Sequence, residues 1–228
     1  MIISRFFIII FLGMVLQGIF ISLEHREKYV AADVFKGLAS AIFVLIGYCA
    51  AAAYPDDTFV QRICLGLLFG LVGDVVMNLR FVFKESAGQK AFLGGILAFL
   101  IGHIAYLVAL VPYSVHLVAV VIIGAAVAAL LLAYIFKTMD VKKAFKIFGV
   151  FYLGAVIFMT VMAVDIAVFA GSRRAILYAI GAVLFMSSDI VLIFNTFSGK
   201  TRFPLRVTNL SLYYIGQILI AVSLIFAY

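Results

Sequence analysis

Residues 175–197 read AILYAIGAVLFMSSDIVLIFNTF, and this stretch decides the fold class. It is a continuous apolar run of 23 residues, which is long enough to cross a bilayer as an α-helix. Asp189 is the only full charge within the run. A carboxylate inside a membrane helix costs roughly 2.5–3.5 kcal/mol on insertion scales, so Asp189 is a candidate functional residue.

A second stretch, residues 59–79, repeats this pattern and carries Asp74 near its end. The segment GDVVM at 73–77 aligns with SDIVL at 188–192. The offset between the two aspartates (189 − 74 = 115) is about half of the 228-residue chain. We therefore predict that Asp74 and Asp189 form one site.

The composition indicates a polytopic membrane protein. Hydrophobic residues make up 67% of the chain and charged residues 12%, whereas soluble domains have about 45–50% and 25%. The net charge of +7 does not require a nucleic-acid partner, since basic residues of membrane proteins gather in cytoplasmic loops. Both cysteines lie inside apolar runs without a His or Cys at metal-binding spacing, so neither a disulfide scaffold nor a zinc site is predicted.

Eight apolar runs predict an all-α bundle of about eight transmembrane helices. Continuous apolarity favours helices over barrel strands, which alternate and are about 10 residues long. The three prolines lie at run edges and no long polar linker interrupts the chain, so residues 1–228 are expected to form a single transmembrane domain. The expected helices cover 6–23, 37–53, 59–79, 92–110, 113–136, 147–170, 175–197 and 205–227.

The basic residues predict how the helices are oriented. Between the runs, 13 of the 17 lysines and arginines fall on one face and 4 on the other, with Lys36 counted on the richer face. The positive-inside rule places the richer face in the cytoplasm and both termini outside. We expect a bacterial inner-membrane protein in which the first run is an uncleaved helix rather than a signal peptide.

The two halves of the chain resemble each other beyond the aspartates. Gly102-His103 matches Gly216-Gln217 at an offset of 114 (217 − 103). Four helices per half give both halves the same orientation, which suggests parallel repeats about an axis along the membrane normal. Chance matching of glycine and apolar residues is the alternative explanation.

Polar residues at similar depth are expected to converge on a cytoplasm-facing pocket around the aspartates. Asn78 follows Asp74 by one helical turn, and His103 and Gln217 fall at comparable distances into their runs. His103 is assigned a positioning role. The residues predicted to bind substrate are Asn78, His103, Tyr106, Ser188, Asn195, Tyr213, Tyr214 and Gln217.

Two carboxyl groups in an apolar cavity can share acid and base work. Burial and mutual repulsion favour a proton on one group while its partner stays ionised, so that one donates a proton and the other accepts one. The alternative is structural, with each aspartate pairing to a nearby polar side chain and locking helices together. Phosphate-binding loops, nucleophile elbows and HExxH motifs are absent from the sequence.

Four motifs carry a resemblance to a known family: GDVVMNL at 73–79, GHIAYL at 102–107, LFMSSDIVLIFNTF at 184–197 and YYIGQILIA at 213–221. With these motifs the chain resembles the YhhN-like lysoplasmalogenases, a family of eight-helix membrane proteins. The resemblance implies hydrolysis of the vinyl ether bond of lysoplasmalogens, which yields a fatty aldehyde and glycerophosphoethanolamine or glycerophosphocholine. It also implies that Asp74 and Asp189 are catalytic, that no cofactor or metal is needed, and that the partners are a lysophospholipid substrate and membrane lipids, without an obligate protein partner.

Other functions remain open from the sequence. A proton-coupled transporter would also use paired carboxylates within repeated helices, although no run shows the glycine- and proline-broken pattern of transport helices. An intramembrane aspartyl protease would share Gly73-Asp74 but lacks its partner motifs here. A purely structural protein would tolerate asparagine at both aspartate positions. Release of aldehyde by the purified protein separates the enzyme from all three.

Overall fold

The computed structural model describes residues 2–83, 85–139, 143–197, 199 and 201–226. Over these residues it contains helices only, and eight of them are long and apolar enough to cross a membrane. The expected all-α bundle of an integral membrane protein is therefore confirmed. The elements are α1 (Ile2–His25), α2 (Tyr29–Ala53), α3 (Thr58–Asn78), η1 (Leu79–Phe81), α4 (Glu85–Leu110), η2 (Val111–Tyr113), α5 (Leu117–Thr138), α6 (Lys143–Ala170), α7 (Arg173–Phe197) and α8 (Phe203–Ser223).

Several helices begin earlier than the apolar runs predicted. Helix α2 starts at Tyr29 instead of residue 37, and α4 starts at Glu85 instead of residue 92. Hydropathy marks only the apolar part of a helix, whereas backbone hydrogen bonds continue through polar residues at the membrane boundary. Counting Lys36 among loop charges was consequently wrong, because it lies inside α2 and is buried.

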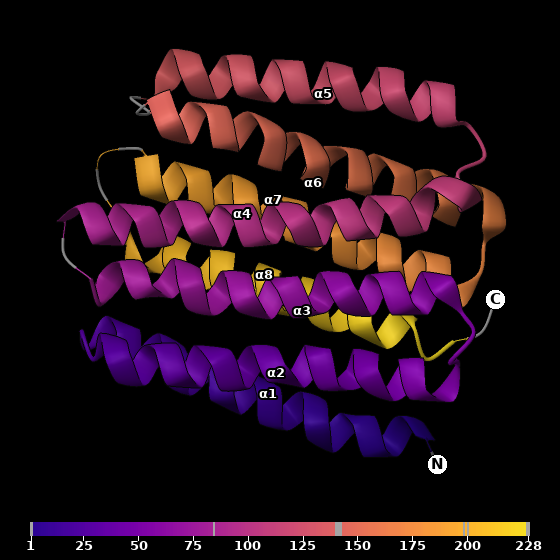
Figure 1. Cartoon of the computed structure of the whole chain (residues 1–228), viewed down its shortest axis with the longest axis horizontal. Coiled ribbons are helices and arrows are strands. Elements are labelled where there is room, and N and C mark those ends of the chain that lie inside the picture. Colours follow the sequence, from indigo (N-terminus) through magenta and orange to yellow (C-terminus); the bar gives the residue numbers. More distant parts are fainter. Residues whose placement is uncertain (1, 84, 140–142, 198, 200, 227–228) are drawn as a thin grey trace.

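The eight helices run side by side, and the two chain ends lie at the same end of the bundle (Figure 1). The C-terminal ends of α1, α3, α5 and α7 lie at the opposite end, which we call the basic face. Three residues of the predicted basic count, Lys84, Lys142 and Lys200, are outside the described residues, as are residues 1 and 227–228. The predicted orientation in the membrane therefore remains a prediction.

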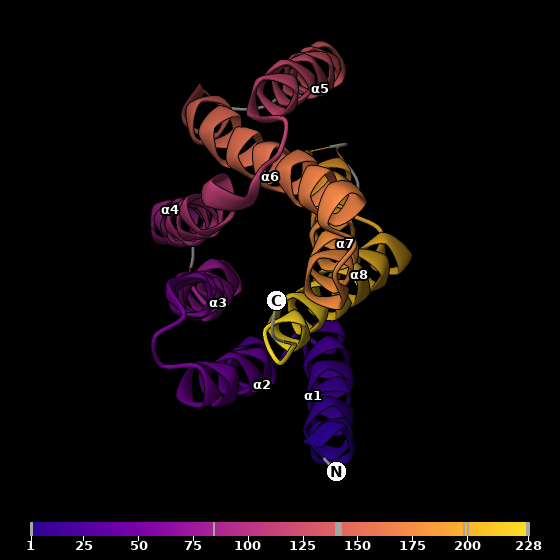
Figure 2. The same ribbon diagram turned by 90° about the vertical axis from the view of Figure 1, so that its right-hand side faces the viewer.

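Viewed along the helix axes, α2, α3, α4, α6, α7 and α8 surround the centre of the bundle (Figure 2). Helix α1 packs outside them against α2 and α8, and α5 packs outside against α6. The contact of α4 with α6 corresponds to the contact of α8 with α2 when the chain is divided into α1–α4 and α5–α8. The centre is thus built from equivalent helices of both halves.

Glycines bring the central helix pairs together at matching positions. A Cβ atom on Gly102 of α4 would lie 2.9 Å from the Gly66 oxygen of α3. A Cβ atom on Gly216 of α8 would lie 2.8 Å from the Gly181 oxygen of α7. Small residues allow this close approach in membrane helices. Gly181 follows Gly66 by 115 residues and Gly216 follows Gly102 by 114, close to the 115 between the aspartates, so the packing supports the four-helix repeat.

Candidate active site

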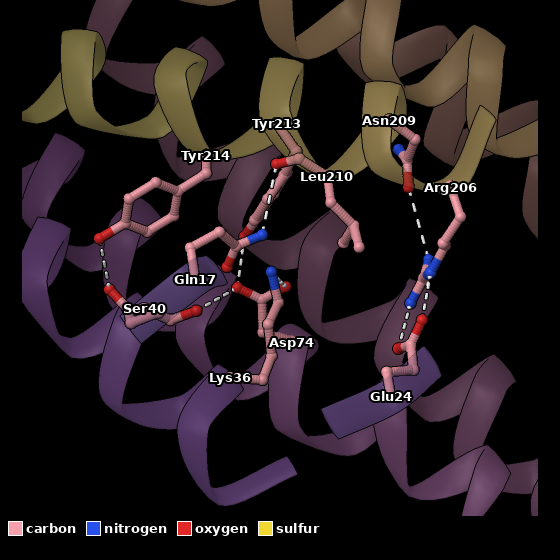
Figure 3. A network of polar contacts seen from close by, with 11 residues as sticks. Gln17, Glu24, Lys36, Ser40, Asp74, Arg206, Asn209, Leu210, Tyr213 and Tyr214 are labelled. Carbon is pink, nitrogen blue, oxygen red and sulfur yellow. Dashed lines mark hydrogen bonds and ion pairs between the residues drawn. The ribbon is translucent and has the colours of Figure 1, made fainter. Parts of the chain in front are cut away.

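Asp74 lies buried at the centre of the bundle, where α2 and α8 supply its partners (Figure 3). Lys36 Nζ of α2 is 3.2 Å from Oδ1. The Tyr213 hydroxyl of α8 donates a hydrogen bond of 2.6 Å to Oδ2, and the Ser40 hydroxyl of α2 donates to the same oxygen. A buried carboxylate is stable only when charge pairing and hydrogen bonds replace its water, and both are provided here.

Asp189 lies at the equivalent place in α7 but has a different environment. Its Oδ2 accepts a hydrogen bond of 2.7 Å from the hydroxyl of Tyr152 in α6. Within the described part of the chain, no basic side chain forms an ion pair with Asp189. This carboxyl group, only 4% exposed, is therefore held by one neutral donor where Asp74 has a cation.

One cavity of about 40 Å³ reaches both aspartates, and we call it the central cavity. This volume exceeds the roughly 10–15 Å³ that a water molecule requires. Asn78, Tyr152 and Tyr213 also line it, together with Phe99. The structure therefore brings four of the sequence-predicted residues to one cavity: Asp74, Asn78, Asp189 and Tyr213.

Two further spaces adjoin the central cavity. The vestibule, about 690 Å³, is lined by residues of α1, α2, η1, α4, α6, α7 and α8. It shares Arg80, Leu192 and Arg206 with the central cavity. The apolar slot, about 60 Å³, lies among α4, α6 and α7 and shares Tyr152 and Asp189 with the central cavity. Asp189 therefore lines both the central cavity and the apolar slot, whereas Asp74 lines the central cavity and neither adjoining space.

His103, Tyr106 and Gln217 form a layer beyond the cavity wall. The Nδ1 atom of His103 is 2.7 Å from the Phe99 oxygen, which can only accept, so this nitrogen carries the proton. Tyr106 donates a hydrogen bond of 3.2 Å to Gln217 Oε1. None of the three lines the central cavity, but the His103 ring packs edge-on against Tyr152, with centroids 5.5 Å apart.

The remaining predicted residues lie in three different places. Ser188 is buried, and its backbone oxygen accepts a hydrogen bond of 2.9 Å from Asn209. Asn195 lines the vestibule and accepts a hydrogen bond of 2.7 Å from the Arg202 backbone N–H. Tyr214 donates to the Ala39 oxygen at 3.0 Å and does not line the central cavity.

Sequence reasoning missed several residues that contact the aspartates. Lys36 was treated as a loop charge, and Ser40 and Tyr152 were hidden in apolar runs. The repeat contains a usable signal, because Tyr152 follows Lys36 by 116 residues (152 − 36) and occupies the matching helix. A search would have to allow a shift of one residue, because the aspartate offset of 115 leads from Lys36 to Phe151.

The donors around the cavity suit proton transfer. Within the described residues, no group of three or more His, Cys, Asp and Glu side chains could hold a metal ion. The polar atoms at the cavity belong to two carboxyl groups, two hydroxyl groups, two amides and three basic groups. Carboxyl groups with unlike partners can act as a proton donor and a proton acceptor.

Comparison with known proteins identifies a family. The model of the YhhN family matches residues 32–224, which cover most of the chain and include both aspartates. No curated protein and no solved structure matches the chain.

Proposed function

Because the chain belongs to the YhhN family, we propose that it is a lysoplasmalogenase, a membrane hydrolase that cleaves the vinyl ether bond of lysoplasmalogens. The products are a fatty aldehyde and glycerophosphoethanolamine or glycerophosphocholine. One observation carries the proposal: Asp74 and Asp189 line the same cavity, one paired with Lys36 and the other with a neutral hydroxyl group.

Asp189 acts first, as the general acid. A vinyl ether is cleaved by protonation of its β-carbon, and the ether oxygen then stabilises the adjacent carbon as an oxocarbenium ion. Asp189 suits this step because it borders the apolar slot and lacks a cationic partner among the described residues. After donating its proton, the Asp189 carboxylate faces the new positive charge and stabilises it.

Asp74 acts second, as the base for water. Water adds to the oxocarbenium carbon and loses a proton to the Asp74 carboxylate, which gives a neutral hemiacetal. The proton of water bound to an oxocarbenium ion is strongly acidic, so the Asp74 carboxylate beside Lys36 is a sufficient acceptor. Tyr213 and Ser40 fix the orientation of the accepting carboxylate.

Collapse of the hemiacetal restores both groups. The hemiacetal hydroxyl gives its proton to the Asp189 carboxylate as the aldehyde carbonyl forms. The carbon–oxygen bond to glycerol breaks, and the departing oxygen takes the proton from Asp74. One water is consumed, and each aspartate returns to its starting protonation state, so the cycle balances on the chain's own carboxyl groups.

The surrounding spaces fit a single-chain lipid. The first carbons of the alkenyl chain would occupy the apolar slot, which is lined by side chains such as Ile96, Leu153 and Ile193. The headgroup would point toward the vestibule at the basic face. We propose that this face lies in the cytoplasm of a bacterial inner membrane, with both termini outside, and that the substrate enters from the inner leaflet without an obligate protein partner.

A panel of lyso-lipids tests the function. Purified protein in a neutral detergent is given lysophospholipids with vinyl ether, ester or alkyl ether bonds, and the expected result is release of aldehyde from the vinyl ether alone. In deuterated water, protonation of carbon must place deuterium at the α-carbon of the aldehyde. An unlabelled aldehyde, or no aldehyde, contradicts the proposal. A reporter fused after Tyr228 tests the orientation and should be found outside the cytoplasm.

A further inference from the structure

Arg80 stands where the central cavity meets the vestibule. The two spaces share Arg80, Leu192 and Arg206, so both charged groups at this junction are arginines. Arg80 lies in η1, immediately after α3, and is six residues beyond Asp74. A substrate group that passes the junction would therefore meet positive charge.

The two arginines differ in how their charge is balanced. Arg206 forms a two-pronged pair with Glu24, with Nε–Oε1 and Nη2–Oε2 distances of 2.7 and 2.8 Å (Figure 3). Arg80 forms neither an ion pair nor a side-chain hydrogen bond with any described residue; its guanidinium carbon lies 4.6 Å from the ring centre of Phe81 and 4.4 Å from that of Phe92.

The unpaired guanidinium of Arg80 is suited to bind an anion. A partly buried guanidinium without a carboxylate partner is unfavourable, and stacking on aromatic rings leaves its edge N–H donors free. The Arg206 guanidinium carbon is 5.8 Å from the same Phe81 ring, so a second positive charge is nearby. Glu24 balances only one of the two charges.

We propose that Arg80 binds the phosphodiester of a lysophospholipid and thereby selects phosphate-bearing lipids over neutral ones. The inference rests on the proposed function of the adjoining aspartates. The guanidinium fork matches two phosphate oxygens, a geometry that lysine cannot reproduce. The Arg206–Glu24 pair holds the second guanidinium in place behind the phosphate.

The spacing along the bundle fits this substrate. Six residues separate Asp74 from Arg80, which corresponds to a rise of about 9 Å along a helix. In a lysoplasmalogen, six bonds separate the vinyl ether carbon from phosphorus, a span of about 7 Å when extended. The arginine side chain covers the remaining gap, so the phosphate reaches Arg80 while the reacting carbon stays beside the aspartates.

The second half of the chain shows that this charge is not a general feature of the repeat. The residue that follows Asp189 by six positions is Asn195, which is neutral. Its side-chain oxygen already accepts a hydrogen bond from the Arg202 backbone N–H. Arg80 is therefore the one charged member of the equivalent pair. A single phosphate site on one side of the cavity would orient an asymmetric lipid in one direction.

A binding experiment tests the proposal without relying on catalysis. A 1-O-alkyl lysophospholipid and the 1-O-alkylglycerol of the same chain length both lack the vinyl ether, so neither should be cleaved. Binding of each is measured with the full chain in a detergent without phosphate. We expect the wild type to prefer the phosphate-bearing lipid. Arg80→Gln should weaken binding of that lipid about 10- to 100-fold and should leave the affinity for the neutral lipid within about two-fold of the wild-type value.

Two variants serve as controls. Arg26→Gln removes the same charge from the basic face at an exposed position that lines neither space, and it should bind both lipids as the wild type does. Arg80→Lys keeps the charge without the fork, and its binding should fall between the wild type and Arg80→Gln. If Arg80→Gln weakens binding of both lipids equally, or of neither, the proposal is overturned.

The wild type alone also decides the question if Arg80→Gln fails to fold. Equal affinity of the wild type for the two lipids would overturn the proposal. Inorganic phosphate, added in large molar excess, tests a free anion as the source of the same chemistry, and we expect it not to displace the lipid. Displacement would show a site for free phosphate and would overturn the lipid assignment. Vinyl ether hydrolysis is measured separately, so failure of the function and failure of this site are distinguishable.

Discussion

Asp74 and Asp189 occupy the same position in the two halves of the chain, yet their neighbours differ. Each aspartate follows by eight residues the glycine that packs its helix against the next one, Gly66 or Gly181. Asp74 has a cation and two hydroxyl donors, whereas Asp189 has one hydroxyl donor. A repeated scaffold thus supplies two equivalent positions, and the changes around them supply two different chemistries.

Two pairs of equivalent positions account for the cation and for one of the two hydroxyl donors. On the preceding helix, Lys36 of the first half corresponds to Tyr152 of the second at an offset of 116 (152 − 36), within one residue of the aspartate offset. On the following helix, Tyr213 reaches across to Asp74, but its counterpart at an offset of 114 (213 − 99) is Phe99, which has no group to donate. Asp189 therefore lacks both the cation and the second hydroxyl donor that stabilise Asp74 as a carboxylate.

The largest expected effect is on turnover. Asp189→Asn removes the acid and Asp74→Asn removes the base, and each should lower kcat by about 10²–10⁴-fold in an aldehyde-release assay. Because the two residues act in one cycle, the double variant should be little slower than either single variant. A single variant with wild-type turnover would return that aspartate to a structural role.

Stability should separate the two aspartates where turnover does not. Asp74→Asn leaves Lys36 buried without its counter-charge, and breaking such a pair costs about 3–5 kcal/mol. Asp189→Asn leaves no charge unpaired and should cost about 1 kcal/mol or less. Unfolding in detergent measures both values.

A second substitution isolates the cause of that difference. Lys36→Met combined with Asp74→Asn removes both charges, so it should recover most of the lost stability without recovering activity. If Asp74→Asn and Asp189→Asn are equally stable, the contrast between a charged and a neutral environment is wrong.

Substitutions at the glycine contacts test whether helix packing contributes equally to stability in the two halves. Gly102→Ala and Gly216→Ala would each force a methyl group to within 3 Å of a backbone oxygen, and each should cost about 1–3 kcal/mol. Gly154→Ala in α6 is the matched control, because nothing lies within 4 Å of its added methyl group and its effect should be neutral or stabilising. Loss of stability in only one half would show that the two glycine contacts, although alike in geometry, do not contribute equally to the free energy of unfolding.

The sequence allowed the helices and the aspartate pair to be predicted, for a simple reason. Insertion into a membrane requires long apolar runs and makes any charge within them conspicuous, so hydropathy and two carboxylates were enough. The helix ends were less predictable, because charged residues continue the helix beyond the apolar run. Lys36 and Arg80 were therefore both counted as loop charges, although each lies at the cavity.

His103 is one of the predicted residues that do not line the central cavity. Its distance into the membrane was counted from residue 92, but α4 begins seven residues earlier, at Glu85. Phe99, one turn closer to the basic face, lines the cavity in its place. Which side chain pairs with which aspartate depends on helix rotation and packing, and a single hydropathy pattern contains neither.

The smallest expected effect comes from making the two aspartates more alike. Phe99 lines the central cavity and packs edge-on against Tyr213 at 6.0 Å, so Phe99→Tyr would place a hydroxyl group at the position equivalent to the Tyr213 hydroxyl. A second donor to Asp189 would stabilise its carboxylate, leave fewer molecules with the proton needed for the first step, and lower kcat a few-fold. Phe99→Leu controls for loss of the ring without gain of a donor. Wild-type kcat in Phe99→Tyr would mean that the number of donors does not distinguish the acid from the base, and the roles assigned to Asp74 and Asp189 would then rest on Lys36 alone.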